Sequence, residues 1–173
     1  MTTYGLIGYP LGHSFSRKFF TEKFEKEGTD AQYLNFEIPS IEEFPNIIKN
    51  SSTLRGLNVT IPYKQQVMQH LDEISKEAKA IGAVNVVKVS KEGLIGYNSD
   101  VIGFVNSIRP LLKPHHKKAL ILGTGGASKA IHYGLEEKLG METLFVSRTA
   151  RQGMITYEEV TTEVLKEYEV IVN

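Results

Sequence analysis

The stretch of sequence that decides the fold is Ala119-Leu120-Ile121-Leu122-Gly123-Thr124-Gly125-Gly126-Ala127-Ser128. Its four apolar residues are typical of a parallel strand buried on both faces. Glycines follow at once, and an amphipathic helical pattern then runs to about Leu139. This order predicts a dinucleotide-binding turn, because glycine lets the backbone approach a pyrophosphate and the helix N-terminus stabilises its charge. Ser128 replaces the third glycine of the G-x-G-x-x-G pattern and is small enough for helix–strand packing. The alternative interpretation is a glycine-rich turn that binds no ligand.

The end of the next expected strand indicates which dinucleotide binds. Thr143-Leu144-Phe145-Val146 is followed by Ser147-Arg148-Thr149-Ala150-Arg151, which contains two arginines and no carboxylate. NAD-binding folds place Asp or Glu here on the ribose 2′-hydroxyl, whereas Arg suits a 2′-phosphate through bidentate, charge-assisted hydrogen bonds. The segment therefore favours NADP, although two solvated loop arginines would look the same.

Short apolar runs alternate with helical periods on both sides of this motif, which predicts an α/β fold with mainly parallel sheets. In the second part, we expect strands 1 to 4 of a doubly wound, Rossmann-type sheet at 119–122, 143–147, 154–156 and 169–172. In the first part, we expect strands at 4–8, 32–38 and 57–61, a hairpin of 84–89 with 94–96, and helices at 15–26, 63–81 and after Ser40. A connecting helix covers about 101–112, and the predicted domains are residues 1–102 and 103–173.

The composition excludes several classes of protein. The 20 Lys and Arg residues balance 20 Asp and Glu, so a net charge of +0 gives no electrostatic attraction to nucleic acid or an anionic membrane. The absence of Cys excludes a disulfide scaffold, a Cys zinc site and a thiol nucleophile, and it fits a reducing cytoplasm. No apolar run approaches the ~20 residues of a membrane span, and no signal peptide is evident.

In the first part of the chain, polar residues gather where apolar strands are expected to end. They occur in His13-Ser14-Phe15-Ser16, in Asn58-Val59-Thr60-Ile61-Pro62-Tyr63-Lys64, around Asn85, and in Gly96-Tyr97-Asn98-Ser99-Asp100. Hydroxyls, amides, one Lys and one Asp suit a small polyhydroxylated carboxylate. Each residue also has a plain interpretation, since Ser14 and Asp100 are ordinary helix N-caps and Lys64 is an ordinary solvated lysine.

The basic segment 113–118, which contains two histidines, predicts neither a metal site nor a nucleic-acid site. His115 and His116 are adjacent in a polar loop, and a metal site would need further ligands that the neighbouring sequence lacks. The basic residues of 113–118 have no interleaved aromatic platform for nucleic acid.

Together, these segments resemble the shikimate dehydrogenase family. The matching stretches occur in the family's order and cover the whole chain: Gly5–Pro10, His13–Ser16, Asn58–Lys64, Gly82–Val87, Gly96–Phe104, Gly123–Ala127 and Ser147–Thr149. The resemblance implies an N-terminal substrate domain, a C-terminal NADP-binding Rossmann domain and catalysis in the cleft between them. It implies an oxidoreductase that reversibly reduces 3-dehydroshikimate to shikimate with NADPH, in chorismate and aromatic amino acid biosynthesis.

The resemblance also implies roles for individual residues. Ser14 and Ser16 would bind the substrate carboxylate, Thr60, Lys64, Asn85 and Asp100 would bind the ring hydroxyls, and Lys64 with Asp100 would form the catalytic pair. The cofactor residues would be Gly123, Thr124, Gly125, Gly126, Ala127, Ser147, Arg148, Thr149 and Arg151. Ser147 departs from the Asn that usually precedes Arg-Thr in the family, but the arginine remains.

Three alternatives stay open: an NAD-dependent quinate/shikimate dehydrogenase, a non-catalytic ligand-binding module of the same fold, and a plain nucleotide-binding scaffold in which residues 14–100 bind nothing. Strands 5 and 6 of the doubly wound order have no counterpart, because Asn173 directly follows an apolar run. We therefore expect an N-terminal fragment with an incomplete second domain, inactive or nearly so as it stands. We expect a cytoplasmic monomer or homodimer with a small-molecule substrate and neither nucleic acid nor membrane as partner.

Overall fold

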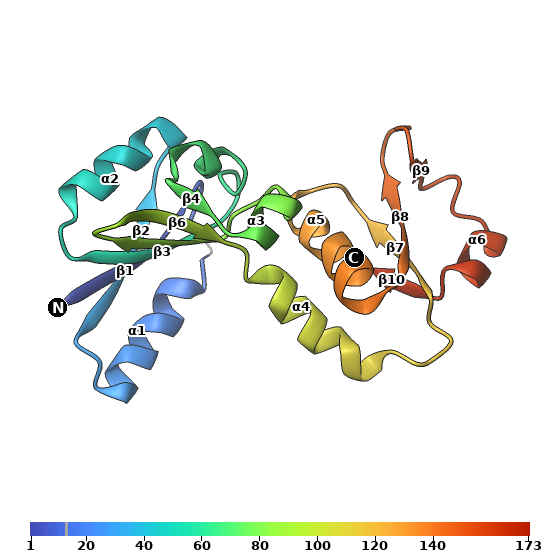
Figure 1. Ribbon diagram of the computed structural model, residues 1–173, viewed down its shortest axis with the longest axis horizontal. Helices are drawn as coiled ribbons and strands as arrows, with labels where there is room; N and C mark the ends of the chain where they lie inside the picture. The colour runs from blue at the N-terminus through green and yellow to red at the C-terminus, as the bar shows by residue number, and fades with distance from the viewer. Residues whose placement is uncertain (13) are drawn as a thin grey trace. The chain divides into compact units, whose positions relative to one another are not determined.

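The computed structural model describes residues 1–12 and 14–173, and the chain divides into two compact units, Met1–Asn98 and Ser99–Asn173. Each unit is an α/β structure with its own sheet (Figure 1), which confirms the predicted fold class. The division comes shortly before the domain boundary that we predict after Ile102, because helix α4 (Asp100–Ile108) packs within the second unit. Its Val105 side chain faces Gly134. Within the described residues, no helix is both long enough and apolar enough to span a membrane.

The first unit is built on a mixed sheet of order β2-β1-β3-β5-β6-β4. Strands β1 (Thr2–Gly8), β2 (Ala31–Glu37) and β3 (Leu54–Val59) run parallel. Strands β5 (Val86–Ser90) and β6 (Gly93–Tyr97) form the predicted hairpin, and the short β4 (Glu73–Ile74) pairs parallel with β6. Because β5 is antiparallel to β3, its amino end lies at the same edge as the carboxyl ends of β1, β3 and β6. This edge is called the polar edge below.

Helices cover both faces of this sheet (Figure 1). Helix α1 (Ser16–Glu27) packs through Phe20 and Phe24 against Leu6 and Tyr33 on one face. The other face holds the larger core around the fully buried Phe44. That core is covered by η1 (Ile41–Glu43), α2 (Phe44–Asn50), η2 (Gln66–His70) and α3 (Lys76–Ile81).

Three local predictions are wrong. Asp100 does not cap α4, because Ser99 occupies the N-cap position and Asp100 is the first residue of the helix. Ser14 does not cap α1, because Phe15 occupies the N-cap position and no side chain caps that end. The helix predicted over 63–81 is interrupted by β4, because this segment pairs with the hairpin instead. There, the Asp72 carboxylate accepts a hydrogen bond from the Leu94 amide at 2.7 Å. Tertiary pairing thus overrides a helical pattern of apolar residues.

The second unit contains a parallel sheet of order β10-β7-β8-β9, which confirms the predicted doubly wound arrangement of its first four strands. The strands are β7 (Lys118–Leu122), β8 (Glu142–Ser147), β9 (Met154–Thr156) and β10 (Val170–Val172). Strand β7 is buried on both faces, because Ala119 and Ile121 pack in one core and Leu120 in another. The helical elements are α4, η3 (Arg109–Leu111), α5 (Gly126–Tyr133), its π-helical continuation η4 (Gly134–Lys138) and α6 (Thr162–Glu167).

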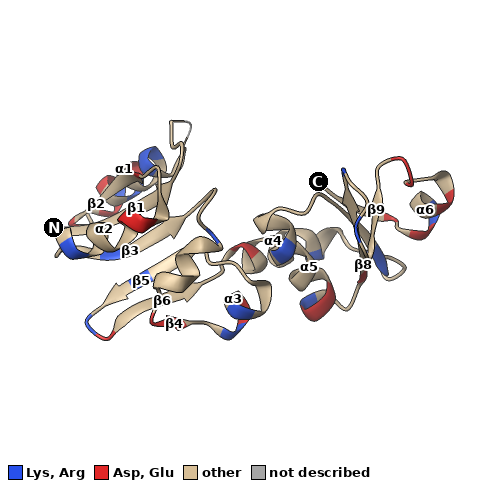
Figure 2. Ribbon diagram, turned by 90° about the horizontal axis from the view of Figure 1, so that it is seen from above, with Lys and Arg blue, Asp and Glu red and all other residues tan. Residues whose placement is uncertain are grey.

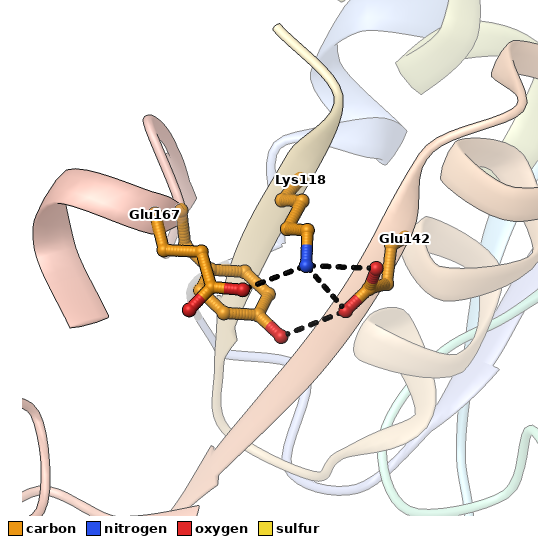
Figure 3. Close-up of polar contacts among 4 residues, drawn as sticks. Lys118, Glu142 and Glu167 are labelled. Atoms are coloured by element: carbon orange, nitrogen blue, oxygen red, sulfur yellow. Dashed lines mark hydrogen bonds and ion pairs between the residues drawn. The ribbon is translucent and has the colours of Figure 1, made fainter.

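An ion-pair cluster lies at the amino end of β7 (Figure 3). The Lys118 ammonium lies 2.7 Å from a Glu167 carboxylate oxygen and 3.0 Å from one of Glu142. The Tyr168 hydroxyl donates to the same Glu142 carboxylate at 3.0 Å. Hydrogen bonds to Glu167 and then Glu142 raise the pKa of Lys118, and the bond from Lys118 lowers the pKa of Glu142. This cluster lies at the end of β7 opposite the glycine-rich turn.

Candidate functional site

The polar edge of the first unit brings together residues from separate strands. Thr60 directly follows β3, and its amide donates to the Ile7 carbonyl of β1 at 2.9 Å. On the other side of β3, the Asn85 carbonyl accepts from the Val59 amide at 2.8 Å. The Asn85 amide in turn donates to the Tyr97 carbonyl of β6 at 3.0 Å. The backbone ladder therefore places Thr60 and the buried Asn85 beside each other at the polar edge.

Lys64 is held at the same edge by its backbone. The Val84 amide donates to the Lys64 carbonyl at 2.7 Å, one residue before Asn85. The loop that carries Lys64 is anchored by Tyr63, which is 3% exposed and donates its hydroxyl hydrogen bond to the Ile38 carbonyl at 2.6 Å. The Lys64 side chain is half-buried. The structure thus places the Lys64 backbone close to Thr60 and Asn85, the residues that the family resemblance groups with it.

Ser14 and Ser16 lie at the start of α1, after the carboxyl end of β1. Ser14 lines an open, polar hollow of about 620 Å³ together with Arg17 and Asn35, and acidic side chains also line it. The Ser14 hydroxyl oxygen is occluded and has no hydrogen-bond partner among residues 1–12 and 14–173. His13, part of the same sequence segment, lies outside the described residues. A buried hydroxyl with unused hydrogen-bonding capacity fits a site for a polar ligand.

Asp100 belongs to the second unit, as the first residue of α4, with Ser99 at the N-cap position. The buried Asn98, two residues earlier, belongs to the first unit, where its amide donates to the Ala83 carbonyl at 3.0 Å. Lys64 and Asp100 therefore lie in different units, and their pairing stays a prediction.

The structure draws attention to Tyr33 of β2, which the sequence analysis did not name, and to Asn58 of β3, which it named without assigning a role. The Tyr33 hydroxyl donates to Asn58 Oδ1 at 2.8 Å. Asn58 could have been found, because it lies two residues before Thr60 and side chains alternate between the faces of a strand. No sequence pattern pointed to the contact of Tyr33 with Asn58, because the two residues are 25 positions apart and belong to strands that are not neighbours in the sheet.

The glycine-rich turn of the second unit joins β7 to α5. Gly123 has φ of +110°, which disfavours any side chain, and its amide donates to the Val146 carbonyl of β8 at 2.9 Å. Gly125 occupies the N-cap position of α5, and no side chain caps that end of the helix. A Cβ built on Gly125 or Gly126 would meet no atom of the described chain within 4 Å, so the space before the helix is open. Ser128 is buried and donates to the Gly125 carbonyl at 2.6 Å.

The arginine segment lies next to this turn, because Leu122 of β7 is in register with Val146 of β8. Ser147 is buried, and its hydroxyl accepts from the Thr149 amide at 3.4 Å. Arg148 and Arg151 are exposed. Uncapped helix amides, open space before the glycines and nearby guanidinium groups fit a phosphate-bearing dinucleotide. Thr124 and Ala127 complete the turn and the first helical turn.

The fold supplies a third possible ligand to the two adjacent histidines. Potential metal-ligating atoms of His115, His116 and Glu169 lie within 4.8 Å of one another, although the neighbouring sequence offered none. However, His116 Nδ1 accepts from the Lys113 amide at 3.2 Å, and His115 and Glu169 are exposed. We assign no metal to this group.

Comparison with known proteins gives consistent matches. Residues 6–87 match the family model of the shikimate dehydrogenase substrate binding domain. The shikimate dehydrogenase (NADP(+)) of Caldicellulosiruptor saccharolyticus is 37% identical over 165 residues, which cover 93% of this chain and 59% of that protein. The chain thus spans about three fifths of the length of the curated relatives it matches.

Solved structures agree with these matches. The shikimate dehydrogenase from Thermotoga maritima superposes with a TM-score of 0.80 at 30% identity, covering 98% of this chain and 67% of that one. The shikimate 5-dehydrogenase from Thermus thermophilus, solved with NADP(H) and shikimate, gives a TM-score of 0.78 at 30% identity. That match covers 100% of this chain and 63% of the Thermus chain.

Proposed function

The chain belongs to the shikimate dehydrogenase family, and from that premise we propose that it serves the reversible, NADPH-dependent reduction of 3-dehydroshikimate to shikimate. The observation that carries the proposal is the polar edge. There, one backbone ladder gathers hydroxyl, amide and ammonium side chains from segments that are far apart in the sequence. Such a mixed set suits a small ring that carries both a carboxylate and several hydroxyls.

Each residue has a role in the proposal. Ser14 and Ser16 bind the substrate carboxylate, and the unused hydroxyl of Ser14 supports this assignment. Thr60 and Asn85 bind ring hydroxyls. Lys64 stabilises the negative charge that develops on the carbonyl oxygen and donates a proton to it. Asp100 acts with Lys64 as a partner that keeps the lysine charged and oriented.

The second unit holds the dinucleotide in this proposal, and the bound cofactor supplies the hydride. The amides of Gly125 and Gly126 bind its pyrophosphate, Gly123 shapes the turn while its own amide stays bonded to Val146, and Thr124 and Ala127 complete the turn. Arg148 and Arg151, with Ser147 and Thr149 beside them, bind the 2′-phosphate and select NADP over NAD. The open space before the glycines and the missing carboxylate at the end of β8 support this assignment.

The proposal extends to a place in chorismate and aromatic amino acid biosynthesis, a cytoplasmic location and a monomeric or homodimeric state. No nucleic-acid partner is proposed, because acidic and basic residues are interspersed along the elements (Figure 2).

Two titrations of the purified chain test the proposal. Calorimetry with shikimate and with quinate should give saturable binding that is tighter for shikimate. Fluorescence titration with NADPH and NADH should give tighter binding of NADPH. Equal or stronger binding of quinate and NADH would support the quinate/shikimate dehydrogenase alternative. Binding of neither ring compound by folded protein would contradict the proposal.

A further inference from the structure

Tyr33 lies on the α1 face of the first sheet, and its hydroxyl bonds to Asn58 near the carboxyl end of β3. It lies in β2, in register with Tyr4 of β1, and its side chain is 4% exposed. Its ring stacks on Phe20 of α1, with centroids 4.7 Å apart and planes 14° from parallel. Packing therefore fixes the direction of the phenol. Because β1 separates β2 from β3, the side chain of Tyr33 spans β1 to reach Asn58.

The donor and acceptor roles of the Tyr33 hydroxyl are fixed by its two neighbours. Its oxygen carries one proton, which it donates to Asn58 Oδ1 at 2.8 Å. The Ser16 hydroxyl also bonds to Tyr33, and it must be the donor in that bond, because the phenol proton is already used. Burial raises the pKa of Tyr33 to about 12, so the phenol keeps its proton throughout the physiological range. Tyr33 is thus a permanent donor to Asn58.

The consequence for Asn58 is a fixed amide orientation. Its Oδ1 is occupied by Tyr33, whereas its Nδ2 group makes no hydrogen bond with any of residues 1–12 and 14–173. The side chain is only partly buried. Asn58 and Thr60 are two residues apart, so their side chains point to the same face of the sheet. An amide held in this way presents two N–H donors, and a ligand must offer an acceptor oxygen to it.

We propose that Tyr33 is a positioning residue that locks the Asn58 amide with its N–H donors directed toward the ligand, which makes this point of the site specific for an acceptor oxygen. The proposal rests on the proposed function for the nature of the ligand, a polyhydroxylated carboxylate. When the Ser16 hydroxyl donates its hydrogen bond to a ligand carboxylate, the hydrogen bond from Tyr33 to Asn58 can remain. Tyr33 therefore acts through Asn58 and touches no ligand itself.

The test compares Tyr33→Phe with Tyr4→Phe as a matched control. Tyr4 is the register partner of Tyr33, and its hydroxyl makes no hydrogen bond within the described residues. In Tyr33→Phe, the Asn58 side-chain amide signals in a ¹⁵N NMR spectrum should shift and broaden, because Oδ1 has lost its donor. The affinity for shikimate should fall about tenfold. Tyr4→Phe should leave both the Asn58 signals and the affinity within twofold of wild type.

The outcomes separate this proposal from the proposed function. Failure of wild-type protein to bind shikimate would contradict the proposed function, whereas the Asn58 signals would still decide the role of Tyr33. Unchanged Asn58 signals in Tyr33→Phe, or wild-type affinity for shikimate in that variant, would overturn the role of Tyr33. If Tyr33→Phe does not fold, wild-type NMR decides. A Tyr33 hydroxyl proton directed at Asn58 Oδ1 supports the proposal, and an Asn58 Nδ2 proton bonded to the Tyr33 oxygen overturns it.

Discussion

The two units build their candidate sites in different ways. In the second unit, one contiguous stretch provides the turn, and the groups that would meet the ligand are mostly backbone amides. In the first unit, Thr60, Lys64 and Asn85 come from separate segments, and their side chains provide the chemistry. A pyrophosphate needs little more than N–H groups and a helix dipole. A ring with a carboxylate and several hydroxyls needs different donors and acceptors at fixed positions, which only a folded sheet edge supplies.

Lys64 gives the largest expected effect, because it is the side chain assigned to proton transfer. In a version of the chain extended to the full length of its relatives, Lys64→Ala should lower kcat at least about 100-fold in an NADPH-linked assay with 3-dehydroshikimate, with a modest change in substrate affinity. Lys79→Ala, which removes an exposed lysine from α3, is the matched control and should leave both unchanged. Turnover at the wild-type rate in Lys64→Ala would remove Lys64 from the mechanism.

Gly125 tests whether the second site depends on backbone and open space. Gly125→Val should lower NADPH affinity about 30-fold, because the side chain would fill the space before α5. The fold should remain intact, since the added Cβ meets no atom of the described chain within 4 Å. Affinity for shikimate and the unfolding temperature are the internal controls. An unchanged NADPH affinity would show that the turn does not hold the dinucleotide.

Arg148 tests one of the side-chain contributions proposed for the second site. Arg148→Ala should weaken NADPH binding about tenfold and leave NADH binding unchanged, because only NADPH carries the 2′-phosphate. Arg109→Ala removes an exposed arginine of η3 from the same unit and controls for the loss of charge. Equal losses for both cofactors would assign Arg148 a general electrostatic role.

The Lys118 cluster gives the smallest expected effect, and it concerns stability at the end of β7 away from the proposed nucleotide site. The pKa of Glu142 is lowered in the folded state, so its contribution is present above the unfolded carboxylate pKa and is lost as pH falls through the folded pKa. The pKa of Lys118 is raised, so its contribution is present below the unfolded lysine pKa and is lost as pH rises through the folded pKa.

Lys118→Met should therefore lower the unfolding temperature by about one to three degrees at pH 7. The difference from wild type should shrink below about pH 4, where the carboxylates are protonated. A difference that does not depend on pH would assign the loss to packing of the lysine stem.

The comparison of the units also explains how much could be predicted from the sequence. The turn at Gly123 to Gly126 and the order of β7, β8, β9 and β10 were predicted correctly, because a contiguous motif and a regular alternation of elements carry them. The family resemblance grouped Thr60 with Asn85, and the backbone ladder places the two residues beside each other. The bond from Tyr33 to Asn58 could not be predicted, because it depends on β1 lying between β2 and β3.

Other local features depended on tertiary structure in the same way. The segment around Asp72 has helical spacing but pairs with β6, because the hairpin offers it a backbone partner. Glu169 approaches His115 and His116 because β10 lies beside β7. Ser14 was expected to cap α1, yet its hydroxyl has no partner within the described chain, and only the fold reveals this.

An amide NMR titration of the labelled chain with shikimate, followed by NADPH, tests the central claim most directly. Shikimate should give saturable shifts at Ser14, Ser16, Thr60, Lys64 and Asn85. NADPH should shift Gly123 to Ala127 and Ser147 to Arg151 instead. A well-dispersed spectrum in which shikimate moves none of the polar-edge signals would contradict the claim that the first unit holds the substrate site.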